Sequence, residues 1–99
     1  MIRLWIVLVK KDEDWDVAYS HEGGNLKEAR EIYNSFSQKM LINWTLEDGL
    51  KIYECDFSEI LWKGNLDPFP FNYLPSKTRV KIFPRVIEYL TCFFRDKVQ

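Results

Sequence analysis

Residues 2–9 have the sequence IRLWIVLV. Because strand side chains alternate between two faces, this run places apolar residues on both, as in a strand that is buried on two sides or central in its sheet. Charged residues at 10–14 predict a turn, and residues 15–20 alternate apolar and polar side chains like a half-buried strand. The N-terminal part of the chain therefore predicts a β-hairpin.

A helix is predicted next, over residues 26–40. Asn25 is a favourable N-cap, and Glu28 stands three residues later, as in a capping box. Apolar residues then recur at helical spacing as far as Met40. Residues 41–48 are expected to form a connection that ends in a turn.

The middle of the chain predicts one further strand and a long loop. Residues 50–57 alternate in the manner of a strand, whereas residues 60–62 fit either a short strand or a single turn. Residues 65–77 contain three prolines and predict an extended loop, and loops of this length are often functional.

The C-terminal part of the chain fits two descriptions. Residues 78–83 alternate charged and apolar side chains, which favours a strand, but apolar residues from Val80 to Phe94 also fit one continuous helix. That helix would contain Pro84, and an interior proline costs about 3 kcal/mol, whereas a proline in the first helical position costs almost nothing. We therefore expect a strand over 78–83 and a helix from Pro84 to about Lys97.

These elements predict an α+β fold: a small antiparallel or mixed sheet of three to five strands with two helices packed on one face. A length of 99 residues suits a single domain, 1–99. The 46% hydrophobic share excludes disorder of the whole chain. The net charge of −1 excludes a strongly basic arm and an acidic DNA-mimicking surface alike.

Cysteine content and the N-terminal run indicate a cytoplasmic protein. Cys55 and Cys92 form no CxxC pair, and one bridge would be few for a small secreted domain. The apolar run at 2–9 is far shorter than the roughly 20 residues that cross a bilayer, and it lacks a cleavage site. We expect reduced thiols and no association with a membrane.

No residue pattern indicates a catalytic site. His21 is the only histidine, and it does not belong to an HExxH motif. The segment 23–25, Gly-Gly-Asn, is explained more simply as a turn and N-cap than as a phosphate-binding loop. Cys55 and Cys92 fit buried apolar positions, and with one histidine they are too few for a metal site. We expect no enzymatic activity, no metal and no cofactor.

A first candidate binding surface is the acidic cluster around Trp15 in the predicted turn. Its acids are Asp12, Glu13, Asp14 and Asp16. The simplest interpretation is a solvated turn. The functional interpretation is an acidic surface for the basic groove of a partner, anchored by Trp15, because tryptophan is enriched among interface hot spots.

A second candidate is the aromatic loop, residues 68–75. It contains Phe69, Phe71 and Tyr73. These rings either fold back into the core or form an exposed patch that binds a protein partner. In the second case the neighbouring prolines would stiffen the loop and so reduce the conformational entropy that it loses on binding. The sequence favours neither interpretation.

A third candidate is a basic segment that follows the aromatic loop. It contains Lys77, Arg79, Lys81 and Arg85, with no acid between them. Cations beside exposed aromatic rings suit single-stranded nucleic acid, which needs phosphate neutralisation and stacking. Four charges are fewer than a dedicated nucleic-acid-binding protein presents.

The sequence leads us to expect a non-catalytic protein-binding module that contacts a larger protein. Phages and mobile elements use small proteins of this kind to inhibit a host or defence-system protein, as an anti-CRISPR protein or a nuclease inhibitor does. The alternative is a nucleic-acid-binding accessory protein that uses the basic and aromatic segment 69–85. A homo-oligomer is compatible with either function.

Overall fold

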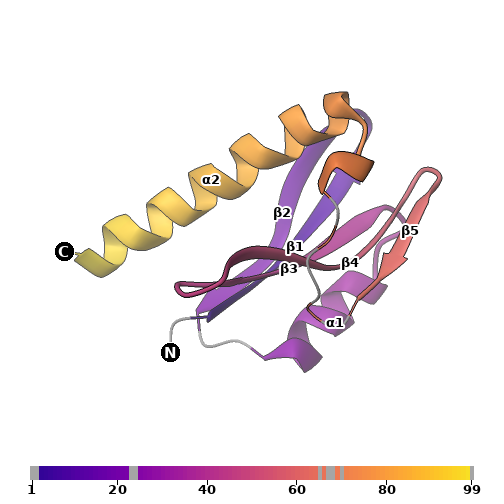
Figure 1. Ribbon diagram of the computed structural model, residues 1–99. Coiled ribbons are helices and arrows are strands. Elements are labelled where there is room, and N and C mark those ends of the chain that lie inside the picture. Colours follow the sequence, from indigo (N-terminus) through magenta and orange to yellow (C-terminus); the bar gives the residue numbers. More distant parts are fainter. Residues whose placement is uncertain (1–2, 23–24, 65, 67–68, 70, 99) are drawn as a thin grey trace. The chain divides into compact units, whose positions relative to one another are not determined.

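The computed structural model describes residues 3–22, 25–64, 66, 69 and 71–98. The chain divides into two compact units, Met1–Phe69 and Pro70–Gln99. Figure 1 shows the elements, which are listed here in chain order: β1 (Arg3–Lys11), β2 (Asp14–Glu22), α1 (Leu26–Asn34), β3 (Lys39–Thr45), β4 (Gly49–Phe57), β5 (Ile60–Lys63), η1 (Phe71–Tyr73) and α2 (Ser76–Val98). The α+β class is confirmed. A single domain, and two helices on one face of the sheet, stay predictions.

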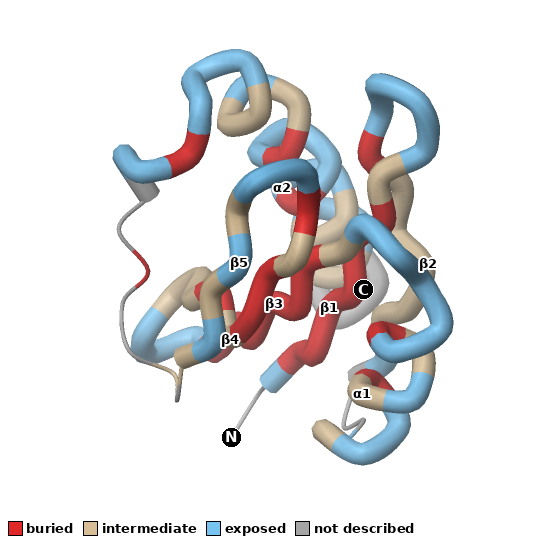
Figure 2. Tube along the Cα trace, turned by 90° about the vertical axis from the view of Figure 1, so that its right-hand side faces the viewer, coloured by how far each residue is buried: buried red, intermediate tan, exposed pale blue. Residues whose placement is uncertain are grey.

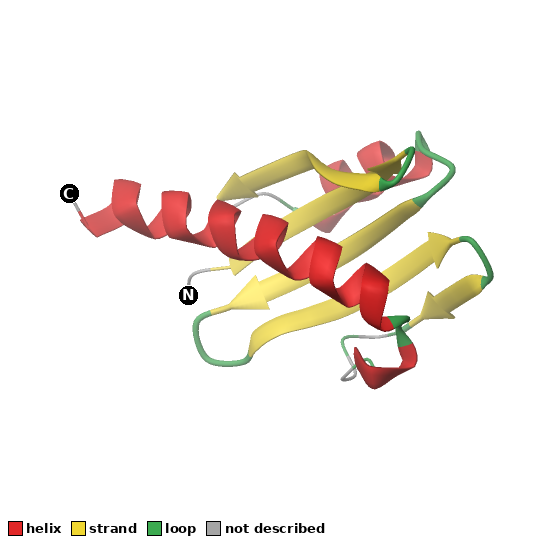
Figure 3. Ribbon diagram, turned by 90° about the horizontal axis from the view of Figure 1, so that it is seen from above, coloured by secondary structure: helices red, strands yellow, loops and turns green. Residues whose placement is uncertain are grey.

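The first unit is built on a five-stranded sheet with the order β2-β1-β3-β4-β5. Every neighbouring pair is antiparallel, and short turns join the strands of each hairpin (Figure 3). The predicted N-terminal hairpin is confirmed as β1 and β2. Residues 60–62, which fit a strand or a turn, belong to the edge strand β5.

The two strands at the centre of the sheet are buried on both faces. In β1, every residue from Leu4 to Val9 is buried, and β3 is buried from Met40 to Thr45 (Figure 2). This confirms the prediction made from the run at 2–9. Burying each large apolar side chain contributes on the order of 1.5–3 kcal/mol, so these strands are the main source of stability in the unit.

Helix α1 covers one face of the sheet. It begins where the sequence predicts, because the Asn25 side chain accepts a hydrogen bond from the Glu28 backbone N–H at 2.8 Å. The Glu28 carboxylate accepts a hydrogen bond from the Tyr19 hydroxyl of β2 at 3.0 Å. Ala29 and Tyr33 of α1 pack in a cluster whose members from the sheet are Trp5, Val7, Val9 and Leu41.

The prediction that the helix continues to residue 40, and that residues 41–48 form a connection, is wrong. Helix α1 ends at Asn34, and the Ser35 hydroxyl donates to the Glu31 carbonyl in its last turn. Residues 39–45 instead form the central strand β3, which pairs with β1 and β4. The helical spacing of Phe36 and Met40 was coincidental, because a run that is apolar on both faces gains more from pairing on two edges.

A bulge changes which side chains of β4 face α1. The pairing of β3 with β4 shifts between Leu41 and Ile42, which leaves Tyr53 as an extra residue in β4. Glu54 lies directly opposite Leu41, a member of the cluster under α1, so its side chain shares that face. Strict alternation along 50–57 did not predict this.

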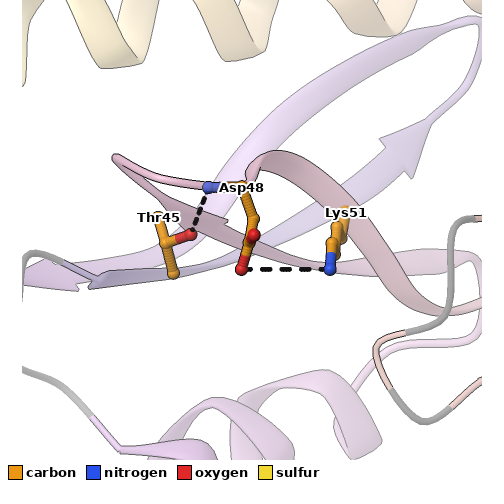
Figure 4. Close-up of polar contacts among 3 residues, drawn as sticks. All are labelled: Thr45, Asp48 and Lys51. Carbon is orange, nitrogen blue, oxygen red and sulfur yellow. Dashed lines mark hydrogen bonds and ion pairs between the residues drawn. The ribbon is translucent and has the colours of Figure 1, made fainter.

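The turn between β3 and β4 is closed by local polar contacts (Figure 4). The Thr45 hydroxyl accepts a hydrogen bond from the Asp48 backbone N–H at 3.0 Å, and the Asp48 carboxylate lies 3.9 Å from the Lys51 ammonium. Gly49 follows with φ +74°, a conformation that favours glycine.

The predicted strand over 78–83 and helix start at Pro84 are both wrong. In the second unit, α2 runs unbroken from Ser76 to Val98 with Pro84 inside it. Ile82 and Val86, on either side of the proline, are buried. Burying these two side chains contributes on the order of 1.5–3 kcal/mol each, which offsets the roughly 3 kcal/mol cost of the proline.

Pro84→Ala is expected to stabilise the protein. The alanine restores the hydrogen bond to the Val80 carbonyl and removes the clash of the proline ring, which together cost the helix about 3 kcal/mol. Alanine also gives the unfolded chain more conformational entropy than proline does, which lowers the free energy of unfolding by about 1 kcal/mol. The free energy of unfolding measured in urea should therefore rise by about 2 kcal/mol in total. Lys77→Ala, a change between two good helix formers, is the control. A loss of stability in Pro84→Ala would show that α2 is not continuous.

Gly49→Ala is expected to lower the free energy of unfolding by about 1 kcal/mol, the cost of a left-handed conformation in an L-residue. The cost comes from the backbone alone, because among the described residues no heavy atom beyond the two chain neighbours lies within 4 Å of the added Cβ. Gly49→Asn should cost less, since asparagine tolerates this region. Urea midpoints measure both, and equal midpoints for all three proteins would contradict the turn geometry.

Candidate functional site

The acidic hairpin turn is exposed, but its tryptophan is not. Asp12, Glu13 and Asp14 are exposed and Asp16 is half-buried. The Trp15 side chain is 2% exposed and packs edge-on against Phe57, with ring centroids 4.9 Å apart. The structure therefore contradicts a role for Trp15 as an exposed anchor, because its ring is part of the core. The acids alone remain as a surface.

The aromatic loop divides between core and surface. Phe69 is 9% exposed and packs edge-on against Trp62 of β5, with ring centroids 5.0 Å apart. Tyr73, in η1, is 71% exposed. The Phe71 side chain and residues 67, 68 and 70 lie outside the part of the chain that the structure describes. Of the aromatic rings that the structure describes in this loop, Tyr73 is therefore the one that a partner can reach.

The basic segment lies on the first three turns of α2. Its members are Lys77, Arg79, Lys81 and Arg85. Arg79 donates a long hydrogen bond of 3.4 Å from its guanidinium to the Asn72 side chain, and its Nε–H is buried without an acceptor among the described residues. Arg85 lies 3.8 Å from Glu88, so its charge is partly neutralised.

Three large apolar side chains are exposed on the same helix. Val80, Phe83 and Ile87 are 70%, 45% and 47% exposed, and their spacing of three and four residues aligns them along one stripe. Two shallow hollows meet at Val80. One is lined by Ser76, Arg79, Val80 and Phe83, and the other by Ser76, Lys77, Val80 and Lys81. The residues of the stripe and of the two hollows, together with Arg85, are called the α2 surface below. Its members are Ser76, Lys77, Arg79, Val80, Lys81, Phe83, Arg85 and Ile87.

Sequence reasoning missed the apolar part of the α2 surface. The periodicity from Val80 onward carried the signal, but the strand assigned to 78–83 would place Val80 and Phe83 on opposite faces. Only a helix through Pro84 brings Val80, Phe83 and Ile87 into line with the cations.

A buried polar cluster lies between α1 and the sheet. Arg30 of α1 is 2.8 Å from the Glu54 carboxylate, and Glu54 is 8% exposed. The Arg30 guanidinium also lies over the rings of Tyr33 and Tyr53, 5.4 and 5.7 Å from their centroids. Burial and the neighbouring Glu54 carboxylate raise the pKa of Tyr33 well above its usual range, so its hydroxyl stays protonated. The Arg30 side chain is 31% exposed, so this ion pair serves mainly to compensate the burial of the Glu54 carboxylate.

The remaining candidate chemistry is dispersed. His21 lies exposed on β2, Cys55 is buried in β4 and Cys92 is exposed on α2, which corrects the buried position expected for Cys92. Burial raises the pKa of the Cys55 thiol to about 11. In the described residues, no three histidine, cysteine or acidic side chains are grouped so that they could hold a metal ion. Nor is any helix in that part of the chain long and apolar enough to span a membrane.

Comparison with protein-family models, curated proteins and solved structures finds no match to this chain.

The two cysteines are expected to differ sharply in reactivity. Cys92 is exposed, whereas Cys55 is buried and its thiol has a pKa raised to about 11. An aromatic disulfide reagent at neutral pH should therefore modify one thiol per chain rapidly and the second at least about a hundredfold more slowly. Cys92→Ser should abolish the fast phase, and two thiols of equal rate would contradict the burial of Cys55.

Proposed function

We propose that this protein is a non-catalytic protein-binding module and that the α2 surface is its main contact. The observation that carries the proposal is the stripe formed by Val80, Phe83 and Ile87, three large apolar side chains that lie exposed in a row. The exposed part of each side chain forfeits the free energy that its burial would contribute, and contiguous apolar patches mark interaction sites.

The surroundings of the stripe support a protein partner. Arg79 borders it on one side and Lys77 and Lys81 on the other, so an apolar centre has a charged rim. Arginine and aromatic residues are the types enriched at interface hot spots, and the surface holds Arg79 and Phe83. Tyr73 of η1 is a further exposed aromatic ring close by in the sequence.

We extend the proposal to inhibition of a host or defence-system protein, such as a nuclease, by occlusion. A chain of 99 residues can cover a site on a larger protein without any chemistry of its own. The exposed acids of the hairpin turn, Asp12, Glu13 and Asp14, support this role, because proteins that bind nucleic acid present basic grooves.

Loss of the stripe is expected to abolish capture of the partner. Immobilised protein should retain a partner from an extract of the source cell, and Phe83→Ser and Val80→Ser should each lower its recovery at least about tenfold. The matched control is Leu61→Ser on β5, since Leu61 is an apolar side chain exposed to 67% outside the α2 surface. Retention of nothing, or equal retention by all variants, would contradict the proposal. Addition of the chain to the purified partner then tests inhibition.

Nucleic-acid binding is the second candidate, and the four cations in one stretch of α2 support it. If a single strand contacted all four cations through its phosphates, the logarithm of the binding constant would fall with the logarithm of the salt concentration with a slope of about −3. Absence of oligonucleotide binding at low salt would exclude this function.

A further inference from the structure

We infer that the segment of the partner that docks on the α2 surface is an acidic amphipathic helix. This inference rests on the proposed protein-binding function and adds the chemistry of the partner. Aliphatic or aromatic residues of that helix contact Val80, Phe83 and Ile87, and its carboxylates face Lys77, Arg79 and Lys81.

The geometry of the stripe suits a helix. Val80, Phe83 and Ile87 follow the spacing at which helices pack side by side, with residues three and four apart forming a ridge. A partner helix presents its own anchors at the same spacing, which is the common mode by which a helical segment occupies an apolar groove. The hollows on the two sides of Val80 provide places for such anchors.

The charge pattern selects an acidic helix. From Ser76 to Ile87 the chain carries four cations and no acid. Because each helical residue advances by about 100°, Lys77 and Lys81 border one side of the stripe and Arg79 the other, while Arg85 falls about 140° from Val80. Carboxylates along both edges of the partner's apolar face would thus meet opposite charges.

The start of α2 strengthens this selection. The positive end of a helix dipole favours acidic side chains, yet the first turn of α2 has none and contains Lys77 and Arg79. The helix dipole and the cations therefore both make the electrostatic potential at the start of α2 positive, and a carboxylate bound there would be stabilised. The Arg79 guanidinium makes one long hydrogen bond of 3.4 Å to Asn72, so its terminal N–H groups can also donate to a carboxylate.

The same observations disfavour two other occupants. A second copy that packed this face against itself by two-fold symmetry would bring cations of like sign together around the apolar stripe. Single-stranded nucleic acid combines phosphate neutralisation with stacking of successive bases on aromatic rings, whereas Phe83 is the one aromatic member of the stripe, beside the aliphatic Val80 and Ile87.

The test uses synthetic peptides of about 18 residues with leucines on one face of the helix, glutamates beside them and alanines at the remaining positions, because alanine has the highest helix propensity. A matched peptide carries lysine for every glutamate, a second carries serine for every leucine, and an oligothymidylate represents nucleic acid. Fluorescence anisotropy with the full chain measures the affinity of each. We expect the acidic leucine peptide to bind and the other two peptides to bind at least about tenfold more weakly.

Variants separate the contributions of the stripe and the cations. Phe83→Ser, Val80→Ser and Arg79→Gln should each weaken binding of the acidic peptide by about tenfold or more. Leu61→Ser and Arg95→Gln are the matched controls, because Arg95 is an exposed cation of α2 about 22 Å along the helix from Val80. Both controls should bind like the unaltered chain, and circular dichroism confirms that each variant is folded.

Three results would overturn the inference. The first is no binding of the acidic peptide, and the second is equal binding of the basic peptide. The third is tighter binding of the oligothymidylate than of the acidic peptide, if Arg79→Gln abolishes that binding and Phe83→Ser leaves it unchanged. The first two leave the protein-binding function intact if the cellular partner is still captured through Phe83. The third replaces that function by nucleic-acid binding.

Discussion

The pairing of β1 with β3 is the interaction on which the first unit depends. The two strands meet along seven residue pairs, and both are buried on two faces. Ile6 lies opposite Ile42 on one face, and Val7 lies opposite Leu41 on the other, beneath α1. A slip of one residue would exchange the faces of the strand, so this register also determines where α1, β2 and β4 attach.

In the second unit, the residues that conflict with the ordinary sequence preferences of a helix lie in one segment of α2. Helix α2 contains a proline in its interior, cations at its positive end and three apolar side chains that are 45% to 70% exposed. Each feature costs stability, and all of them fall between Ser76 and Ile87. Sequences that violate local rules tend to do so at functional sites. The α2 surface is such a concentration, and this supports its assignment to a partner.

Much of the sheet could be predicted from the sequence, because alternation and turn residues act locally. The run at 2–9, the turn after Lys10 and the N-cap at Asn25 carried enough information. Strand β3 could not be predicted, because apolar residues on both faces of a strand also satisfy helical spacing, and only pairing with β1 and β4 decides between the two. The burial of Trp15 and Phe69 likewise depends on Phe57 and Trp62, which the sequence cannot place. The cations of the α2 surface were found and its apolar stripe was not, since the penalty for Pro84 outweighed the helical pattern.

The continuity of α2 through Pro84 is the central claim, because the stripe and its cations share a surface only if residues 76–87 are helical. Backbone chemical shifts of residues 78–83, measured by NMR on the full chain without a partner, test it most directly. Helical Cα shifts throughout this segment are the result expected from the structure. Strand-like shifts would contradict it, since Val80 and Phe83 would then point to opposite sides and the α2 surface would not exist.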